Sequence, residues 1–281
     1  ILISEGLVIE AGQKKTSSGR KPIQLEINKT NRTFLAIDIK PDVIYIALYN
    51  LAMEQLHQEV ISHHAIEATP EETIGLLWKR VQEMCKDTKK NITELNGVGI
   101  SIPGVLNTDE GEVLYAPLFG WKRVKLIDIF KQHTGPATPI WFDRTSKLAL
   151  KTELWQNKNE DITGVMLYVC EGIETSIVLN GKIMSSFSFD AGNFAHMTVN
   201  PQGPECTCGN QGCWELFSGF QYFLEDYPDK SPDEKVYDTF LRFKDDCLNK
   251  KDTALHFLDR YIYWFTMGLE NIIAGLYLPE I

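Results

Sequence analysis

The sequence predicts a two-lobed α/β protein, and three observations lead to that fold class. The chain has 281 residues, which is long for a single hydrophobic core and favours two lobes. In each half of the chain, segments with the strand period are followed by segments with the helical period. One histidine and three cysteines fall within twenty residues of the second half, as in a metal site. The predicted parts are residues 1–31, a first lobe over 32–160 and a second lobe over 161–281.

Composition and charge exclude several classes of protein. Hydrophobic residues make up 43% of the chain, and no stretch approaches the roughly 20 apolar residues of a membrane span. The first residues lack the basic start and cleavage site of a signal peptide. Three of the six cysteines are isolated along the chain, which is the usage of a reducing compartment, so we expect a cytoplasmic protein. A net charge of −10 argues against nucleic acid binding over the whole surface.

The first segment has a different charge balance from the body. Residues 1–32 hold six basic and three acidic side chains. Extended stretches at 6–10 and 23–28 flank a polar, glycine-containing tip, which predicts a hairpin. The tip holds the basic residues that could lie along a phosphate backbone: Lys14, Lys15, Arg20 and Lys21. From charge alone, a solvated hairpin without a ligand fits equally well.

A family resemblance begins in this segment. Residues 3–8, the Ser-Ser-Gly-Arg-Lys-Pro stretch at 17–22 and Ile23-Gln24-Leu25 resemble the wing of a winged helix-turn-helix. It is the version found in regulators of the ROK family (repressors, open reading frames, kinases). The resemblance implies operator DNA as a partner and a homodimer as the usual form. It also implies that residues 1–31 are the remnant of a winged-helix module whose helices are not in this chain.

The first lobe is predicted from residue 33 onward. Strands at 33–39, 43–49 and 58–63 form a meander, and a helix follows at 70–89 with one apolar face. That face holds Ile74, Leu77, Trp78 and Val81. A short buried strand comes next at 97–102. The arrangement resembles the first lobe of the actin-like, ribonuclease H-like sugar kinase fold, to which the ROK family belongs.

Two loops depart from the kinases of that family. Lys40-Pro41-Asp42 stands where they carry a glycine and threonine loop that holds ATP phosphates; proline removes a donor and Asp42 repels phosphate. The second phosphate loop, a Thr-Gly-x-Gly-Gly-Gly run in the family, aligns with Glu171-Gly172-Ile173-Glu174-Thr175-Ser176. Only Gly172 is retained, and two carboxylates have entered. The sequence therefore predicts a protein that is not an enzyme.

The same resemblance places sugar contacts in the first lobe. Residues 101–107, with Gly104, match the family's sugar-pocket loop, and Leu118 stands for a sugar-contacting asparagine. A helix at 125–133, a strand at 139–143 and a helix at 144–156 follow. The junction reads Asn-Asp in the family and Phe142-Asp143 here, and the resemblance implies a sugar contact for Asp143. The other interpretation of Asp143 is a helix N-cap.

The second lobe is predicted as a meander followed by helices. Its strands lie at 164–170, 174–179 and 182–187, with a type I′ turn at Asn180-Gly181. Its helices lie at 217–224, 233–249 and 253–276. The family fold continues beyond this point with a further strand and helices, so we expect the second lobe to be incomplete at residue 281.

The cluster between these parts has the composition of a closed zinc site. His196, Cys206, Cys208 and Cys213 supply one imidazole and three thiols, a Cys₃His set. Gly209 and Gly212 let the loop fold back on itself. A disulfide fits less well, because Cys206 and Cys208 are too close in sequence and a bridge to Cys213 leaves one thiol over. Structural zinc is the favoured interpretation, and free or bridged thiols are the alternative.

The cluster also carries the most specific part of the resemblance. Residues 190–196 correspond to the family's Gly-Glu-x-Gly-His motif, with Asn193 in place of the glutamate, and the four cluster residues match the family's zinc ligands. The resemblance implies sugar contacts for Asn193, His196 and Glu215. Without it, Glu215 would be an exposed residue in the first turn of a helix.

The leading functional hypothesis is a sugar-responsive, DNA-binding transcriptional repressor. Its effector would be a sugar or a sugar phosphate, Zn²⁺ its structural metal, and operator DNA its target. One alternative is an ATP-dependent sugar kinase with Asp143 as the base. Another is a regulator controlled by a protein partner, in which Leu118, Phe142 and Asn193 mark a degraded pocket.

Overall fold

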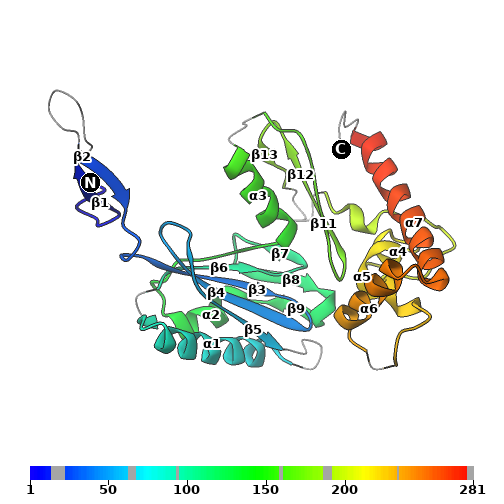
Figure 1. The fold of residues 1–281 in the computed structure, drawn as a ribbon, viewed down its shortest axis with the longest axis horizontal. Helices are drawn as coiled ribbons and strands as arrows, with labels where there is room; N and C mark the ends of the chain where they lie inside the picture. Colours follow the sequence, from blue (N-terminus) through cyan, green and yellow to red (C-terminus); the bar gives the residue numbers. More distant parts are fainter. Residues whose placement is uncertain are drawn as a thin grey trace. The chain divides into compact units, whose positions relative to one another are not determined.

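The computed structural model describes residues 1–13, 23–62, 68–92, 95–157, 161–185, 192–232 and 234–276. The chain divides into two compact units, Ile1–Arg144 and Thr145–Ile281 (Figure 1). The division falls before the boundary at residue 160 that the sequence predicted. The reason is helix α3 (Thr145–Asn157), which packs on the strands that follow it, so it is counted with the second unit.

A hairpin opens the first unit. Strands β1 (Val8–Gln13) and β2 (Ile23–Ile27) pair antiparallel, with a bulge between Glu10 and Gly12. Ile9 and all of the apolar side chains of β2 are exposed. The tip of the predicted hairpin lies outside the described residues, and so do Lys14, Lys15, Arg20 and Lys21.

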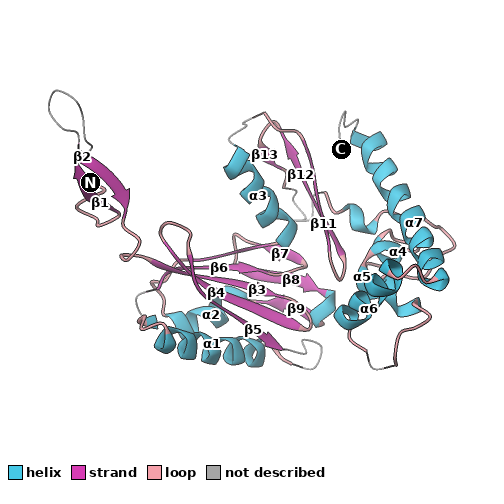
Figure 2. Ribbon diagram, viewed as in Figure 1, coloured by secondary structure: helices cyan, strands magenta, loops and turns pink. Residues whose placement is uncertain are grey.

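The centre of the first unit is a five-stranded sheet with the order β10-β6-β3-β4-β5 (Figure 2). Strands β3 (Thr33–Ile39), β4 (Val43–Asn50) and β5 (Gln55–Ser62) form the predicted antiparallel meander. Strands β6 (Leu95–Ser101) and β10 (Ile140–Asp143) run parallel to β3. Every second residue of β3 is buried, because one face of the sheet packs into the core.

Two helices pack into that core. Helix α1 (Pro70–Asp87) starts with a capping box in which Thr69 and Glu72 bond each other's backbone amides. Its predicted apolar face is confirmed, since Ile74, Leu77, Trp78 and Val81 are all buried. Helix α2 (Leu126–Thr134) adds Leu126, Ile129 and Phe130.

A small sheet that the sequence did not predict lies between β6 and α2. It is formed by β7 (Val105–Asn107), β8 (Glu112–Ala116) and β9 (Trp121–Val124), with the 3-10 turn η2 (Pro117–Phe119) between the last two. Strands of three to five residues give almost no periodic signal, so sequence reasoning read this stretch as loops.

The second unit begins with α3 on a three-stranded sheet. The strands are β11 (Gly164–Val169), β12 (Ile173–Leu179) and β13 (Lys182–Ile183), in that order. Asn180 and Gly181 have φ of +50° and +70°, as the predicted type I′ turn requires. The 3-10 turn η3 (Phe194–His196) then leads into the cysteine loop.

Helices complete the second unit. They are α4 (Glu215–Ser218), α5 (Phe220–Phe223), the 3-10 turn η4 (Leu224–Asp226), α6 (Val236–Leu248) and α7 (Asp252–Leu276). The single helix predicted over 217–224 is wrong: Gly219 is extended and separates α4 from α5. A Cβ there would lie 3.1 Å from both the Glu171 carbonyl oxygen and the Gly172 Cα, so the backbone of that segment packs closely against Gly219. In the described part of the chain, no helix is both long and apolar enough to cross a membrane.

Candidate metal centre

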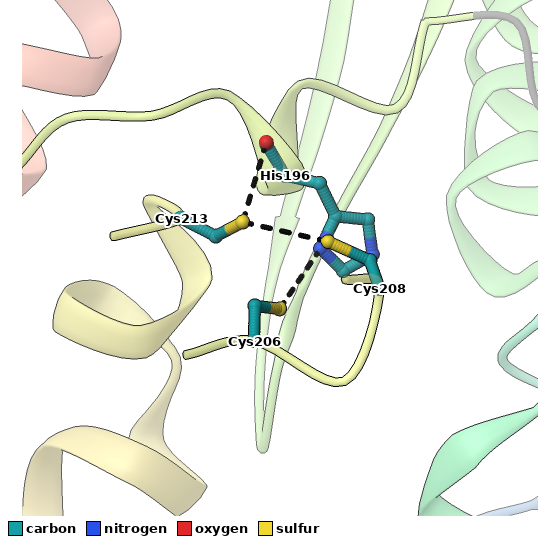
Figure 3. Close-up of side chains that lie close together, drawn as sticks. All are labelled: His196, Cys206, Cys208 and Cys213. Atoms are coloured by element: carbon teal, nitrogen blue, oxygen red, sulfur yellow. Dashed lines mark hydrogen bonds between the residues drawn. The ribbon is translucent and has the colours of Figure 1, made fainter. Parts of the chain in front are cut away.

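One imidazole and three thiols converge in the second unit (Figure 3). His196 ends η3, Cys206 and Cys208 lie in the loop that follows, and Cys213 lies two residues before α4. The four ligand atoms all lie within 4.8 Å of one another. The structure therefore brings together the four residues that the sequence singled out.

The spacing of the donor atoms fits a tetrahedral cation. Zn–S bonds of about 2.3 Å and Zn–N bonds of about 2.0–2.1 Å place neighbouring ligand atoms roughly 3.5–3.8 Å apart. The Sγ atom of Cys206 is 3.6 Å from Nδ1 of His196, and the Sγ atoms of Cys208 and Cys213 are 3.6 Å apart. All six cysteines are free thiols in the structure, so the bridged alternative finds no support.

The loop is held in this shape by its own backbone. Trp214 N–H donates to the Met197 carbonyl at 2.9 Å, and Gly212 N–H donates to the Pro204 carbonyl at 2.8 Å. Gly212 has φ of +67°, and a Cβ on it would overlap the Asn200 carbonyl. Only glycine fits there, so the predicted role of Gly212 in folding the loop is confirmed.

Burial shapes the chemistry of the thiols. It raises the pKa of the Cys206 and Cys213 thiols, because a thiolate loses solvation inside the protein. A divalent cation at the centre of the four ligands would supply the opposite charge that holds these thiols deprotonated. Residues with this donor set and spacing could hold a metal ion.

Glu215 lies directly beside the cluster. Its Oε2 atom is 3.8 Å from Nδ1 of His196, and its Oε1 atom accepts from the Ile173 N–H at 3.4 Å. Burial raises the pKa of the Glu215 carboxyl to about 7, and the charge of Glu174 adds to the rise while the Ile173 hydrogen bond opposes it. The side chain is only 13% exposed, so the exposed-residue interpretation of Glu215 is wrong.

The close contact between Glu215 and β12 depends on Gly172. A Cβ on Gly172 would overlap the Glu215 carboxylate, so the backbone of Gly172 lies directly against that carboxylate. Asn193, the other predicted contact in this unit, comes directly before η3 and therefore lies three residues from His196. The second unit thus gathers Asn193, His196 and Glu215 around one end of β12.

The remaining predicted sugar contacts lie in the first unit. Gly104 has φ of +136°, and a Cβ there would lie 2.6 Å from the Tyr115 carbonyl oxygen. Asp143 ends β10 and is 7% exposed, and its Oδ1 atom accepts from the Arg144 N–H at 2.9 Å. Gly104 therefore has a backbone conformation that favours glycine, and Asp143 is buried at the end of its strand.

The register of the sheet brings Asp38, which sequence reasoning did not place among the sugar contacts, next to the predicted sugar-pocket loop. Asp38 of β3 pairs with Ser101 of β6, and Ser101 pairs with Asp143 of β10. Carboxyl ends of parallel strands are where ligands bind in open α/β sheets. The signal was present in the sequence, since Asp38, Ser101 and Asp143 each lie at or one residue before the end of a predicted strand.

Phe142 proves to be a core residue. It is 6% exposed and belongs to the buried cluster formed with α1 and α2, while Leu118 packs against the same cluster. Their side chains therefore stabilise the core. This removes two of the three substitutions on which the degraded-pocket hypothesis rested.

Comparison with known proteins fixes the family. The model of the ROK family matches residues 34–277. The chain belongs to the ROK family. The family and the two-lobed fold that the sequence predicted are thereby confirmed.

Curated ROK relatives include sugar repressors. The xylose repressor of Caldicellulosiruptor bescii is 30% identical over 224 residues, which cover 79% of this chain and 55% of that protein. The xylose repressor of Bacillus subtilis is 26% identical over 274 residues, which cover 97% of this chain and 69% of that protein. The chain thus spans about half to two thirds of the length of these relatives.

Solved ROK structures share the fold. A ROK family transcriptional regulator, described as a homolog of the Escherichia coli MLC protein, matches with a TM-score of 0.68 and 20% identity over 99% of this chain and 79% of its own. A ROK glucokinase from Streptomyces griseus, solved with glucose and AMPPNP, matches with a TM-score of 0.69 and 17% identity over 87% of this chain and 80% of its own. The fold is therefore shared by regulators and kinases alike.

Proposed function

We propose that this chain is the effector-binding body of a sugar-responsive transcriptional repressor and that it has no kinase activity. The observation that carries the proposal is the sequence similarity to repressors. The xylose repressors of Caldicellulosiruptor bescii and Bacillus subtilis are 30% and 26% identical to the chain, whereas the glucokinase is 17% identical. The β1–β2 hairpin lies before residue 34, where the ROK family match begins.

Local structure at the two phosphate-loop positions supports the absence of kinase activity. The turn at 40–42 is tight, with Lys40 N–H donating to the Val43 carbonyl, and Pro41 has no N–H to offer. At the second position the Thr175 hydroxyl accepts from Phe194 N–H at 2.8 Å and donates to the Gly192 carbonyl. These groups form hydrogen bonds within the protein, so they are less able to donate hydrogen bonds to a phosphate.

In this proposal residues 1–31 contact operator DNA as the wing of a winged helix, with Lys14, Lys15, Arg20 and Lys21 on the phosphate backbone. The two lobes, 32–160 and 161–281, bind the sugar through Gly104, Asp143, Asn193, His196 and Glu215. The repressor acts as a cytoplasmic homodimer. The sugar must bind one conformational state of the body better than the other, since only differential affinity can change DNA binding.

Sugar binding is the direct test. Calorimetric titration of the chain with a panel of common pentoses and hexoses should identify at least one ligand. Glu215→Gln should weaken that ligand, because a buried acceptor of sugar hydroxyls loses its charge, while Glu270→Gln on the exposed face of α7 should not. The whole protein should then release operator DNA on adding the same sugar; no binding by any sugar refutes the proposal.

The kinase alternative is tested by a coupled assay for ATP consumption. We expect no sugar-dependent turnover above background. Turnover that disappears in Asp143→Ala would establish the kinase and refute the repressor body as the sole function.

We also propose that the metal is structural Zn²⁺ held by His196, Cys206, Cys208 and Cys213. The donor set and the 3.6 Å ligand spacings support it. Cys208→Ser should abolish stoichiometric zinc, measured by elemental mass spectrometry, and lower the thermal midpoint. Cys247→Ser, which lies outside the cluster, should retain zinc. Full zinc content in Cys208→Ser would refute the assignment.

A further inference from the structure

Glu174 occupies the amino-terminal end of helix α3 with its own negative charge. Its Oε2 atom accepts from the Ser146 N–H, the second residue of α3, at 3.0 Å. The Ser146 hydroxyl lies 2.8 Å from the Ser176 hydroxyl, and both serines are fully buried. The first amides of a helix form the positive end of its dipole and attract anions. In this unit a carboxylate of the same chain already fills that position.

The same strand end connects Glu174 to the metal centre. Ile173, the preceding residue, donates its N–H to Glu215, which lies beside His196. Carboxylates therefore occupy two backbone amides, those of Ser146 and Ile173, beside the start of β12.

The neighbouring polar groups form hydrogen bonds within the protein. The Thr175 hydroxyl donates to the Gly192 carbonyl, and the Ser146 and Ser176 hydroxyls bond each other. The Ile173 amide is used by Glu215 and the Ser146 amide by Glu174. An incoming phosphate would have to displace a carboxylate to reach either amide.

We propose that Glu174 is an internal anion that makes the site in the second unit select uncharged sugars over sugar phosphates. The inference rests on the proposed sugar-binding function and names the class of effector. A phosphate monoester carries roughly −1.5 to −2 charges at pH 7, so it is repelled by the Glu174 carboxylate. The hydroxyls of an uncharged sugar donate hydrogen bonds to carboxylates and are not repelled.

The first experiment uses inorganic phosphate, so it does not depend on any sugar. Phosphate is titrated into the ¹⁵N-labelled chain while the Ser146 amide resonance is followed. We expect no saturable shift in the wild type or in Glu270→Gln, and a saturable shift in Glu174→Ala, which frees the amide. Glu174→Ser also removes the acceptor from the Ser146 amide, so it serves if Glu174→Ala does not fold. Phosphate binding at Ser146 in the wild type, or none in either variant, overturns the inference.

The second experiment compares sugars with their phosphates by calorimetry. The pairs are glucose with glucose 6-phosphate and N-acetylglucosamine with its 6-phosphate. We expect the phosphate of a bound sugar to bind at least about 100-fold more weakly than the sugar, and Glu174→Gln to reduce that ratio by about tenfold. Glu270→Gln should leave the ratio unchanged. Equal binding of a sugar and its phosphate by the wild type overturns the inference and leaves sugar sensing intact.

The two experiments separate the possible failures. If no sugar of any kind binds, the proposed function fails, and the phosphate titration still decides whether Glu174 excludes anions. If sugars bind but Glu174→Gln keeps the wild-type ratio, Glu174 is not the selective residue.

Discussion

Gly268 lies in the middle of α7 and packs directly against Trp214. Trp214 is completely buried and follows the metal-cluster residue Cys213. Its indole N–H donates to the Trp264 carbonyl at 3.1 Å, and its ring lies 5.7 Å from the ring centre of Phe265. A Cβ on Gly268 would overlap three atoms of the indole. The backbone of α7 at Gly268 is therefore in direct contact with the Trp214 indole ring.

We predict that Gly268→Ala destabilises the protein even though alanine is the better helix former. Helix propensity alone would stabilise the variant by about 1 kcal/mol. Overpacking in a filled core costs typically 1–3 kcal/mol, and here both neighbours are rigid, an aromatic ring and a helix backbone. Taking the upper end of that range, the net loss is about 2 kcal/mol.

Gly275→Ala in the same helix is the matched control. A Cβ at Gly275 has no neighbour within 4 Å, so only the propensity gain applies. Because Gly275 is near the end of α7, we expect stabilisation of about 0.5 kcal/mol. The same substitution in one helix should thus have opposite signs at the two positions.

Urea unfolding followed by far-ultraviolet circular dichroism measures both variants, and elemental mass spectrometry measures their metal content. Gly268→Ala should also lose metal more readily, because the displaced indole adjoins the cluster loop. Stabilisation of Gly268→Ala equal to that of Gly275→Ala would refute the packing argument.

Three further predictions concern other parts of the chain. Thr69→Ala should cost about 1 kcal/mol in urea unfolding, because the capping box with Glu72 is lost. Gly212→Ala should reduce the metal content, because a Cβ would overlap the Asn200 carbonyl and prevent the loop from adopting its backbone conformation. A metal content equal to that of the wild type would contradict this prediction. The Tyr227 hydroxyl donates to Asp246 at 2.5 Å and lowers the pKa of that carboxyl. The stability that Asp246 gains in this way is present above its unfolded-state pKa and is lost as the pH falls. The free energy of unfolding of Tyr227→Phe should therefore decrease less steeply in acid than that of the wild type. An unchanged pH dependence of the unfolding free energy would count against the bond.

Much of the local structure could be predicted because its causes are local. The capping residues and apolar period of α1 lie within one segment, and Asn180-Gly181 specifies its turn by backbone preference alone. Failures occurred where packing overrode the local pattern. Gly219 interrupts the helical period where the backbone of Glu171 and Gly172 packs closely against it. The strands β7 to β9 are too short to carry a period.

The residues of the candidate site also fall into those that the sequence could predict and those that it could not. The four metal ligands fall within eighteen residues, so their number and spacing were enough to predict the cluster from the sequence. The burial of Glu215 could not be predicted, since it depends on Ile173, which lies 42 residues earlier in the chain. The bond between Glu174 and Ser146 spans 28 residues and joins a strand to a helix end.

The sequence by itself determined the family, the two-lobed α/β class and the four residues of the candidate metal cluster. These features depend on residue type and on spacing along the chain. The tertiary structure decided which carboxylates are buried, which amides they occupy and that Phe142 belongs to the core. Those features depend on contacts between residues far apart in sequence, because burial and electrostatic environment exist only once the elements have packed together.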